Sequence, residues 1–126
     1  MPDTSDFRFP KSARLLVSGE FQRVSSRGRR IATQFFILLT LPVQSDQTRL
    51  GITVSRKVGN AVQRTRVKRV IREQFRLCRL RFASGYDCVV IAKPQAGRTI
   101  NAELHDDLRD LFSRLEKWAA RPLDPA

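Results

Sequence analysis

The chain has 126 residues, the size of one domain, and 41% of them are hydrophobic, so a packed core is expected. Its 24 Lys and Arg residues outnumber its 12 Asp and Glu residues, and the net charge of +12 indicates a polyanionic partner, with nucleic acid first and an anionic membrane second. No apolar run approaches the roughly 18 residues of a transmembrane helix, and residues 1–11 lack a signal-peptide pattern. Two cysteines and a single histidine argue against a zinc site, and we expect a cytoplasmic protein in which Cys78 and Cys88 are reduced core residues.

The first half of the chain is expected to hold a flexible arm, a short helix and two strands. Residues 1–13 form the arm, and Ser18 is placed to cap a helix that ends near Val24. Ile31–Leu41 is rich in β-branched and aromatic residues, which predicts one long strand. The alternating segment Leu50–Ser55 predicts a second strand, and its spacing from the first favours a hairpin between the two.

The second half is expected to contribute two long helices and one more strand. The sequence Asn60-x-x-Gln63 resembles a capping box and predicts a helix that continues to about Leu80. Tyr86–Ala92 is almost continuously apolar, which predicts a central strand that lies parallel to the preceding strand across the helix. Asn101 begins a last, strongly amphipathic helix, and residues 120–126 form a tail. The fold class is therefore α+β: one α-β sandwich domain over residues 14–119, with the order α-β-β-α-β-α.

The helix after Asn60 carries the strongest functional signal. At about 100° per residue, six cations share one face roughly 140° wide. They are Arg64, Lys68, Arg69, Arg72, Arg76 and Arg79. Like charges four residues apart repel, so an ordinary solvated face would mix in acidic residues, whereas only Glu73 is acidic here. Arginine predominates, which suits phosphate binding and base stacking, and we interpret this face as an RNA-binding surface rather than a solvated or membrane-lying one.

No catalytic constellation accompanies this surface in the sequence. His105 is the only histidine, so neither a Ser/His/Asp nor a Cys/His arrangement can be argued. Asp106, Asp107 and Asp110 lie on the last helix, where they complement the helix dipole and the neighbouring Arg109 more simply than they bind a metal. We therefore expect no catalytic residue and no metal ligand in the protein.

The segment GITVSRKVGNAVQRTRVKRVIREQFR resembles the signature region of the bacterial ribonuclease P protein family. The family pattern is a strand ending in V-S-x-K, followed by G-N-A-V, Arg-Asn-Arg, x-K-R, x-x-R-E and x-F-R, and the chain follows it from Val54 to Arg76. Thr65 stands where the family has the central Asn. The threonine side chain has a hydroxyl but lacks the amide of Asn. Phe21-Gln22-Arg23-Val24 and Ala92-Lys93-Pro94 extend the similarity more weakly.

The resemblance implies a fold with a left-handed β-α-β crossover, of the ribosomal S5 domain 2-like type, although most such crossovers are right-handed. It also implies the protein subunit of an endoribonuclease whose catalytic RNA subunit, with magnesium, cleaves precursor tRNA to make the mature 5′ end. The expected partners are that RNA and precursor tRNA, with no membrane and no required protein partner.

The resemblance further implies two sets of site residues. The contacts to the RNA subunit would be Arg64, Thr65, Arg66, Lys68, Arg69, Arg72 and Arg76. The contacts to the single-stranded 5′ leader, in a cleft between the sheet and the first helix, would be Phe21, Phe36, Ser55, Lys57 and Asn60. The alternative function is that of a ribosomal or other structural RNA-binding protein with a similar small α+β fold and no role in cleavage.

Overall fold

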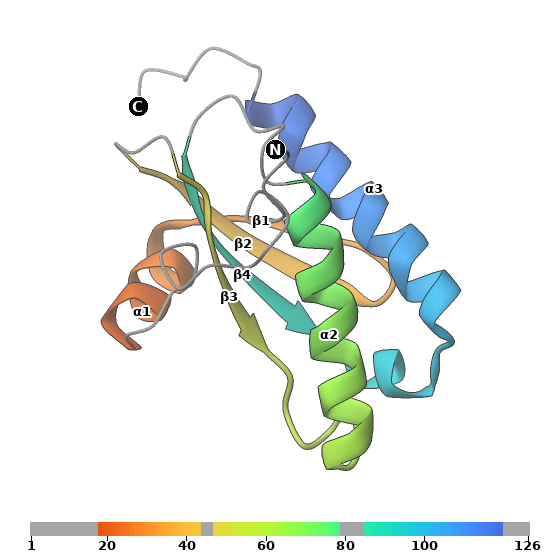
Figure 1. The fold of residues 1–126 in the computed structure, drawn as a ribbon. Helices are drawn as coiled ribbons and strands as arrows, with labels where there is room; N and C mark the ends of the chain where they lie inside the picture. The colour runs from red at the N-terminus through yellow and green to blue at the C-terminus, as the bar shows by residue number, and fades with distance from the viewer. Residues whose placement is uncertain (1–17, 44–46, 79–84, 120–126) are drawn as a thin grey trace, which may run out of the picture.

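The computed structural model describes residues 18–43, 47–78 and 85–119, in an α+β architecture that confirms the expected fold class (Figure 1). In chain order the elements are α1 (Ser18–Arg27), β1 (Arg29–Ala32), β2 (Phe36–Pro42), β3 (Arg49–Thr53), α2 (Ala61–Cys78), β4 (Tyr86–Ala92), the short 3-10 helix η4 (Pro94–Arg98) and α3 (Asn101–Ala119). The predicted arm and tail lie outside the described residues.

The four strands form one mixed sheet in the order β1-β2-β4-β3. β2 pairs antiparallel with both β1 and β4, whereas β3 pairs parallel with β4, so that Leu38 and Ile52 both lie opposite Val90. The prediction that Tyr86–Ala92 is a central strand with a parallel neighbour is therefore confirmed. The left-handed sense of the β3-α2-β4 crossover stays an expectation from the family resemblance.

Two predictions for the N-terminal strands were wrong. The single strand predicted over residues 31–41 is two strands, because the chain turns at Thr33, whose backbone N–H donates to the carbonyl of Phe36 at 2.9 Å. Asp107 of α3 holds this turn by accepting hydrogen bonds from the Thr33 hydroxyl at 2.6 Å and from the backbone N–H of Phe35 at 3.0 Å. The predicted hairpin between residues 31–41 and 50–55 is absent, because the most buried strand, β4, lies between β2 and β3.

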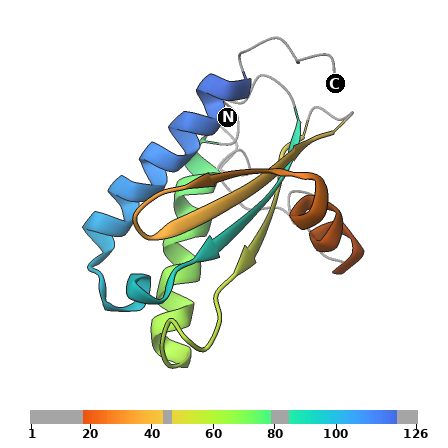
Figure 2. The same cartoon turned by 180° about the vertical axis from the view of Figure 1, so that it is seen from behind.

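The helices cover the two faces of the sheet unequally. α2 and α3 cover one face, and the shorter α1 covers part of the other, as the two opposite views show (Figures 1 and 2). Alternation along the strands divides the side chains between these faces. Phe36, Leu38 and Val90 join the main core under α2 and α3, whereas Leu39 and Val89 form a small cluster with Val24 of α1.

The two long helices meet through aromatic and aliphatic side chains. The rings of Phe75 in α2 and Phe112 in α3 pack edge to face with their centroids 5.9 Å apart. Both cysteines are free and buried, as expected, and burial raises the pKa of the Cys88 thiol to about 12, although the hydrogen bond with Thr40 lowers it. One side of α2 is therefore packed in the core, and the other side reaches the surface.

Candidate nucleic-acid interface

The start of α2 is built by a capping box, as the sequence predicted. The backbone N–H of Gln63 donates to Oδ1 of Asn60 at 2.9 Å, and the backbone N–H of Asn60 donates to Oε1 of Gln63 at 2.9 Å. Gly59 precedes the cap with φ +155°, and a Cβ at this position would lie 1.9 Å from Oε1 of Gln63. The Gly-Asn-x-x-Gln sequence therefore sets where the basic helix begins and which way its first turn faces.

The exposed side of α2 presents a continuous row of cations, which we call the basic face: Arg64, Lys68, Arg69, Arg72 and Arg76. Arg69 and Arg72 are exposed, and the other three are half-buried. None of the five side chains forms a hydrogen bond or an ion pair with another described residue. The Nε atoms of Arg64 and Arg76 are buried and also lack a partner among the described residues.

Thr65 and Arg66 differ in how far they are free to bind RNA. Thr65 is exposed beside the basic face, as the prediction requires. Arg66 instead donates from Nη1 to Oδ1 of Asn101 at 2.7 Å and to the carbonyl of Thr99 at 2.9 Å. Its Nη2 donates to the carbonyl of Gly97 at 2.9 Å. Three donated hydrogen bonds thus tie Arg66 to the η4–α3 segment, so Arg66 links α2 to the start of α3, and its contact with RNA stays a prediction.

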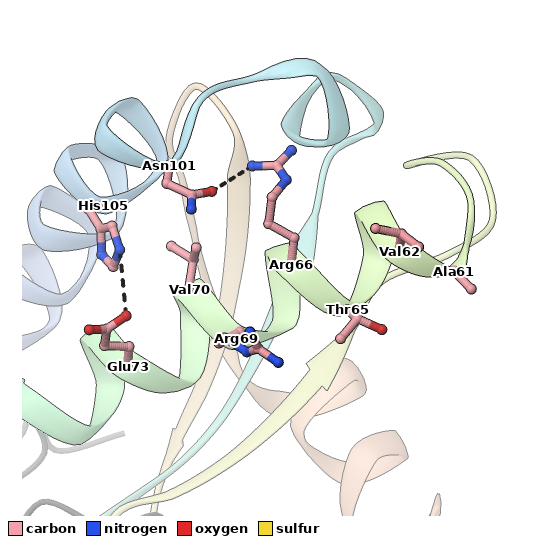
Figure 3. Close-up of a pocket in the computed structure, with 9 residues that line it drawn as sticks. All are labelled: Ala61, Val62, Thr65, Arg66, Arg69, Val70, Glu73, Asn101 and His105. Carbon is pink, nitrogen blue, oxygen red and sulfur yellow. Dashed lines mark hydrogen bonds and ion pairs between the residues drawn. The ribbon is translucent and has the colours of Figure 1, made fainter.

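A groove of about 440 Å³ runs along the junction of α2 and α3, next to the basic face (Figure 3). Arg66, Arg69 and Val70 line it from α2, and Asn101 and His105 line it from α3. A second hollow of about 370 Å³ lies among Arg69, Arg72, Glu73 and Arg76. Nε2 of His105 lies 3.7 Å from Oε2 of Glu73, so the lone acidic side chain of α2 lies between α3 and the arginines of the second hollow.

The predicted leader-binding residues do not all reach the surface. Phe36 is 0% exposed in the main core, so its ring has no free face on which a base could stack, and this prediction was wrong. Ser55 and Lys57 are exposed in the turn between β3 and α2, where the Ser55 hydroxyl accepts from the backbone N–H of Lys57 at 3.3 Å. Asn60 is exposed, although its carbonyl oxygen is used by the cap. Phe21 falls within α1, and its side chain lies outside the described part of the structure.

The face of the sheet that α1 only partly covers holds apolar side chains that the sequence reading missed. We call it the α1-side face, and its half-buried members are Ile37, Leu39, Leu41 and Ile91. Each immediately precedes or follows a residue that points into the main core, so strand alternation was the signal that identifies them. Phe36 points into the main core, and its neighbour Ile37 lies on the opposite, α1-side face of the sheet.

Neither a metal site nor a membrane span is found in the described part of the chain. No three His, Cys, Asp or Glu side chains of residues 18–43, 47–78 and 85–119 lie close enough together to hold a metal ion. In the same residues, no helix combines the length and the apolar character needed to cross a membrane.

Comparison with protein families agrees with this geometry. Residues 9–116 match the family model described as Ribonuclease P. The ribonuclease P protein component of Desulforapulum autotrophicum is 41% identical over 109 residues, which cover 86% of this chain and 93% of that protein. That of Geotalea uraniireducens is 42% identical over 111 residues, which cover 88% and 97%.

Solved structures give the same result. The chain resembles the ribonuclease P protein of Staphylococcus aureus with a TM-score of 0.78 and 32% identity, covering 83% of this chain and 96% of that one. It resembles the ribonuclease P protein of Thermotoga maritima with a TM-score of 0.72 and 30% identity, covering 80% and 96%. Sequence and fold therefore point in one direction over most of the chain.

Proposed function

This chain belongs to the ribonuclease P protein family, and we propose that it joins two RNAs in one cytoplasmic enzyme that matures the 5′ end of tRNA. The basic face of α2 binds the catalytic RNA subunit. The α1-side face binds the single-stranded 5′ leader of precursor tRNA.

The observation that carries the proposal is the set of unpaired cations on the basic face. Five Lys and Arg side chains on one helix have no acidic partner among the described residues. Cations so placed bind backbone phosphates and release the counterions condensed around the RNA. A structured RNA that follows the helix would relieve the repulsion between Arg64, Lys68 and Arg72, which follow one another at intervals of four residues.

The α1-side face has the chemistry that unpaired nucleotides require. Its half-buried aliphatic side chains offer apolar surface to bases, and Phe21 of α1 is the aromatic candidate for stacking. Exposed Ser55 and Lys57, near the β3 edge, supply a hydroxyl and a cation for the leader backbone. Because leader and RNA subunit use different surfaces in this proposal, substitutions separate the two binding events.

Catalysis in this proposal belongs to the RNA subunit and its magnesium ions. His105 is the only histidine of the chain, and its Nε2 lies 3.7 Å from Oε2 of Glu73, so the sequence offers no Ser/His/Asp or Cys/His arrangement to argue for. The protein contributes binding and orientation of the substrate beside the catalytic RNA.

Reconstitution tests the proposal directly. Rigorously RNA-free protein, the cognate RNA subunit, and both together are incubated with precursor tRNA and magnesium. We expect 5′ maturation only where the RNA subunit is present, with the protein lowering the KM for precursor tRNA. Robust processing by the protein alone would contradict the assignment of catalysis to RNA.

A second experiment tests the leader surface. Phe21→Ala should weaken binding of precursor tRNA by the assembled enzyme and leave assembly with the RNA subunit intact, because stacking on a base contributes about 1–3 kcal/mol. The loss should vanish with mature tRNA, which has no leader. A variant that melts normally and still prefers the precursor as strongly as wild type would remove Phe21 from the leader-binding set.

A further inference from the structure

A buried carboxylate ties α1 to the sheet. Asp87 of β4 is 0% exposed, and its Oδ2 accepts a hydrogen bond from Nη2 of Arg23 in α1 at 2.8 Å. Arg49 of β3 donates from Nε to Oδ1 at 2.9 Å and from Nη2 to Oδ2 at 2.8 Å. An unpaired carboxylate in this apolar strand would be strongly destabilising, so the two guanidinium groups explain how Asp87 is accommodated.

The two arginines are not equivalent. Arg49 binds Asp87 through two nitrogens, and its side chain is 30% exposed. Arg23 uses one nitrogen and is 46% exposed, and its Nε and Nη1 donate to no other described residue. Two arginines share one carboxylate, so the cluster of Arg23, Arg49 and Asp87 keeps a net positive charge. Arg23 is its most exposed member.

The surroundings of Arg23 match the chemistry of single-stranded RNA. Val24, the next residue of α1, packs with Val89 and the half-buried Leu39, Leu41 and Ile91 on the α1-side face. A cation held beside apolar side chains is what a backbone phosphate and its neighbouring unpaired base require.

We propose that Arg23 contacts a phosphate of the 5′ leader and that Asp87 is the residue that positions Arg23 for this contact. The inference rests on the leader-binding role proposed above and adds a contact to it. Arg23 is already anchored at one nitrogen, so it loses less conformational freedom on binding than an unanchored arginine would. Asp87 also joins α1 to β3 and β4, so it holds the helix over the surface that the leader occupies.

The test uses the holoenzyme reconstituted with its RNA subunit and measures Kd for two precursors, one with a leader of about eight nucleotides and one with a leader of about one. Arg23→Ala should bind the long-leader precursor about three- to tenfold more weakly and reduce the slope of log Kd against log salt by about 0.7. Binding of the short-leader precursor should be unchanged. The control is Arg27→Ala, an exposed arginine in the last turn of the same helix with no side-chain partner among the described residues, which should bind both precursors like wild type.

Leaders with one uncharged methylphosphonate linkage identify the contact independently of protein stability. At the contacted position this linkage should weaken wild type, and it should have no further effect in Arg23→Ala, since the two changes remove the same interaction. If Arg23→Ala melts early, Arg23→Gln replaces it, because the amide still donates to Asp87 without carrying charge. Additive effects at every linkage would overturn the Arg23 contact.

Asp87→Asn tests the positioning role, because it keeps the shape of the side chain and removes its charge. We expect the variant to bind the long-leader precursor more weakly than wild type and to bind the RNA subunit with unchanged affinity. The difference from wild type should become smaller as the leader is shortened. Unchanged leader affinity in this variant would overturn the role of Asp87 alone. If the wild-type holoenzyme shows no preference for the long leader, both the leader-binding function and this inference fail; if it does and Arg23→Ala keeps it in full, only the inference fails.

Discussion

Helices α2 and α3 are similar in length and in their position on the sheet, but they differ in charge. They have 18 and 19 residues, lie side by side on the same face of the sheet, and bury an apolar stripe in the same core (Figure 1). α2 has six Lys and Arg residues and one acidic residue, whereas α3 has three and five. Within α3 two of the three cations are matched: Arg109 pairs with Asp106 at 2.9 Å and Arg114 with Asp110 at 3.0 Å.

The difference teaches that pairing, more than the number of charges, separates a solvated helix from a binding one. α3 pairs both of its arginines along its own surface and carries more acidic than basic residues, so its charges do not favour an anionic partner. α2 spaces like charges four residues apart, and its only acidic side chain lies near His105 of α3, so we expect its basic face to bind an anionic partner. Four sets of substitutions test this comparison.

The largest effect is expected where the two helices join. Phe75→Ala removes the 0%-exposed ring that packs against Phe112, and we expect the free energy of unfolding to fall by about 3–5 kcal/mol. Leu77→Ala, two residues away at a side chain that is 46% exposed, should change it by less than about 0.5 kcal/mol. Urea unfolding followed by circular dichroism measures both. Equal losses of stability in the two variants would mean that the Phe75–Phe112 contact does not stabilise the protein more than an exposed position of α2 does.

The basic face should be next. Replacing Arg64, Lys68, Arg69 or Arg72 with Ala should weaken binding of the RNA subunit about five- to tenfold near 0.15 M salt and reduce the log–log salt slope by about 0.7–0.9 each. Arg114→Ala, whose guanidinium is already paired within α3, should have little effect, as should Lys117→Ala. Filter binding over a salt series provides the measurement. Equal effects from the two helices would show that the basic face is not the interface.

Arg66 sharpens the comparison, because it lies on α2 but is bound to the η4–α3 connection. Arg66→Ala leaves the carbonyls of Gly97 and Thr99 without their donor, and we expect a loss of about 1–3 kcal/mol in stability. The salt slope for the RNA subunit should change much less than in Arg69→Ala. A slope change as large as that of Arg69→Ala, with normal stability, would return Arg66 to the RNA contacts.

The smallest effect is expected at Glu73, the acidic exception on α2. Glu73→Gln removes a negative charge next to Arg69 and Arg76, and we expect RNA-subunit binding to tighten about two- to threefold at low salt, with the gain fading as salt screens it. Glu116→Gln on α3 serves as the matched control and should change nothing. Weaker binding in Glu73→Gln would indicate that its pairing with His105 orders the groove for RNA.

The local sequence was sufficient to predict those elements whose structure is decided by residues close together in the chain. The capping box at Asn60 and Gln63, the amphipathic helices and the apolar strand Tyr86–Ala92 were predicted, because each rests on contacts or periodicity within a few residues. The shared face of the cations on α2 was also predicted, since helical geometry alone sets it. The family signature from Val54 to Arg76 predicted the family, which the family model and the relatives confirm.

Tertiary structure decided what depends on residues far apart in the chain. Asp107 stabilises the turn that divides residues 31–41 into two strands, and no local pattern shows a hydrogen bond across more than 70 residues. Insertion of β4 between β2 and β3 depends on which strand buries both faces, which is a property of the assembled sheet. The same assembly turned Phe36 into the core and left Ile37 half-buried on the opposite face, and it tied Arg66 to the η4–α3 segment through hydrogen bonds across about 30 residues. Sequence thus determined which cations α2 carries and in what order. The packed structure decided which of their side chains remain unpaired, because burial and hydrogen bonding are settled only when distant segments meet.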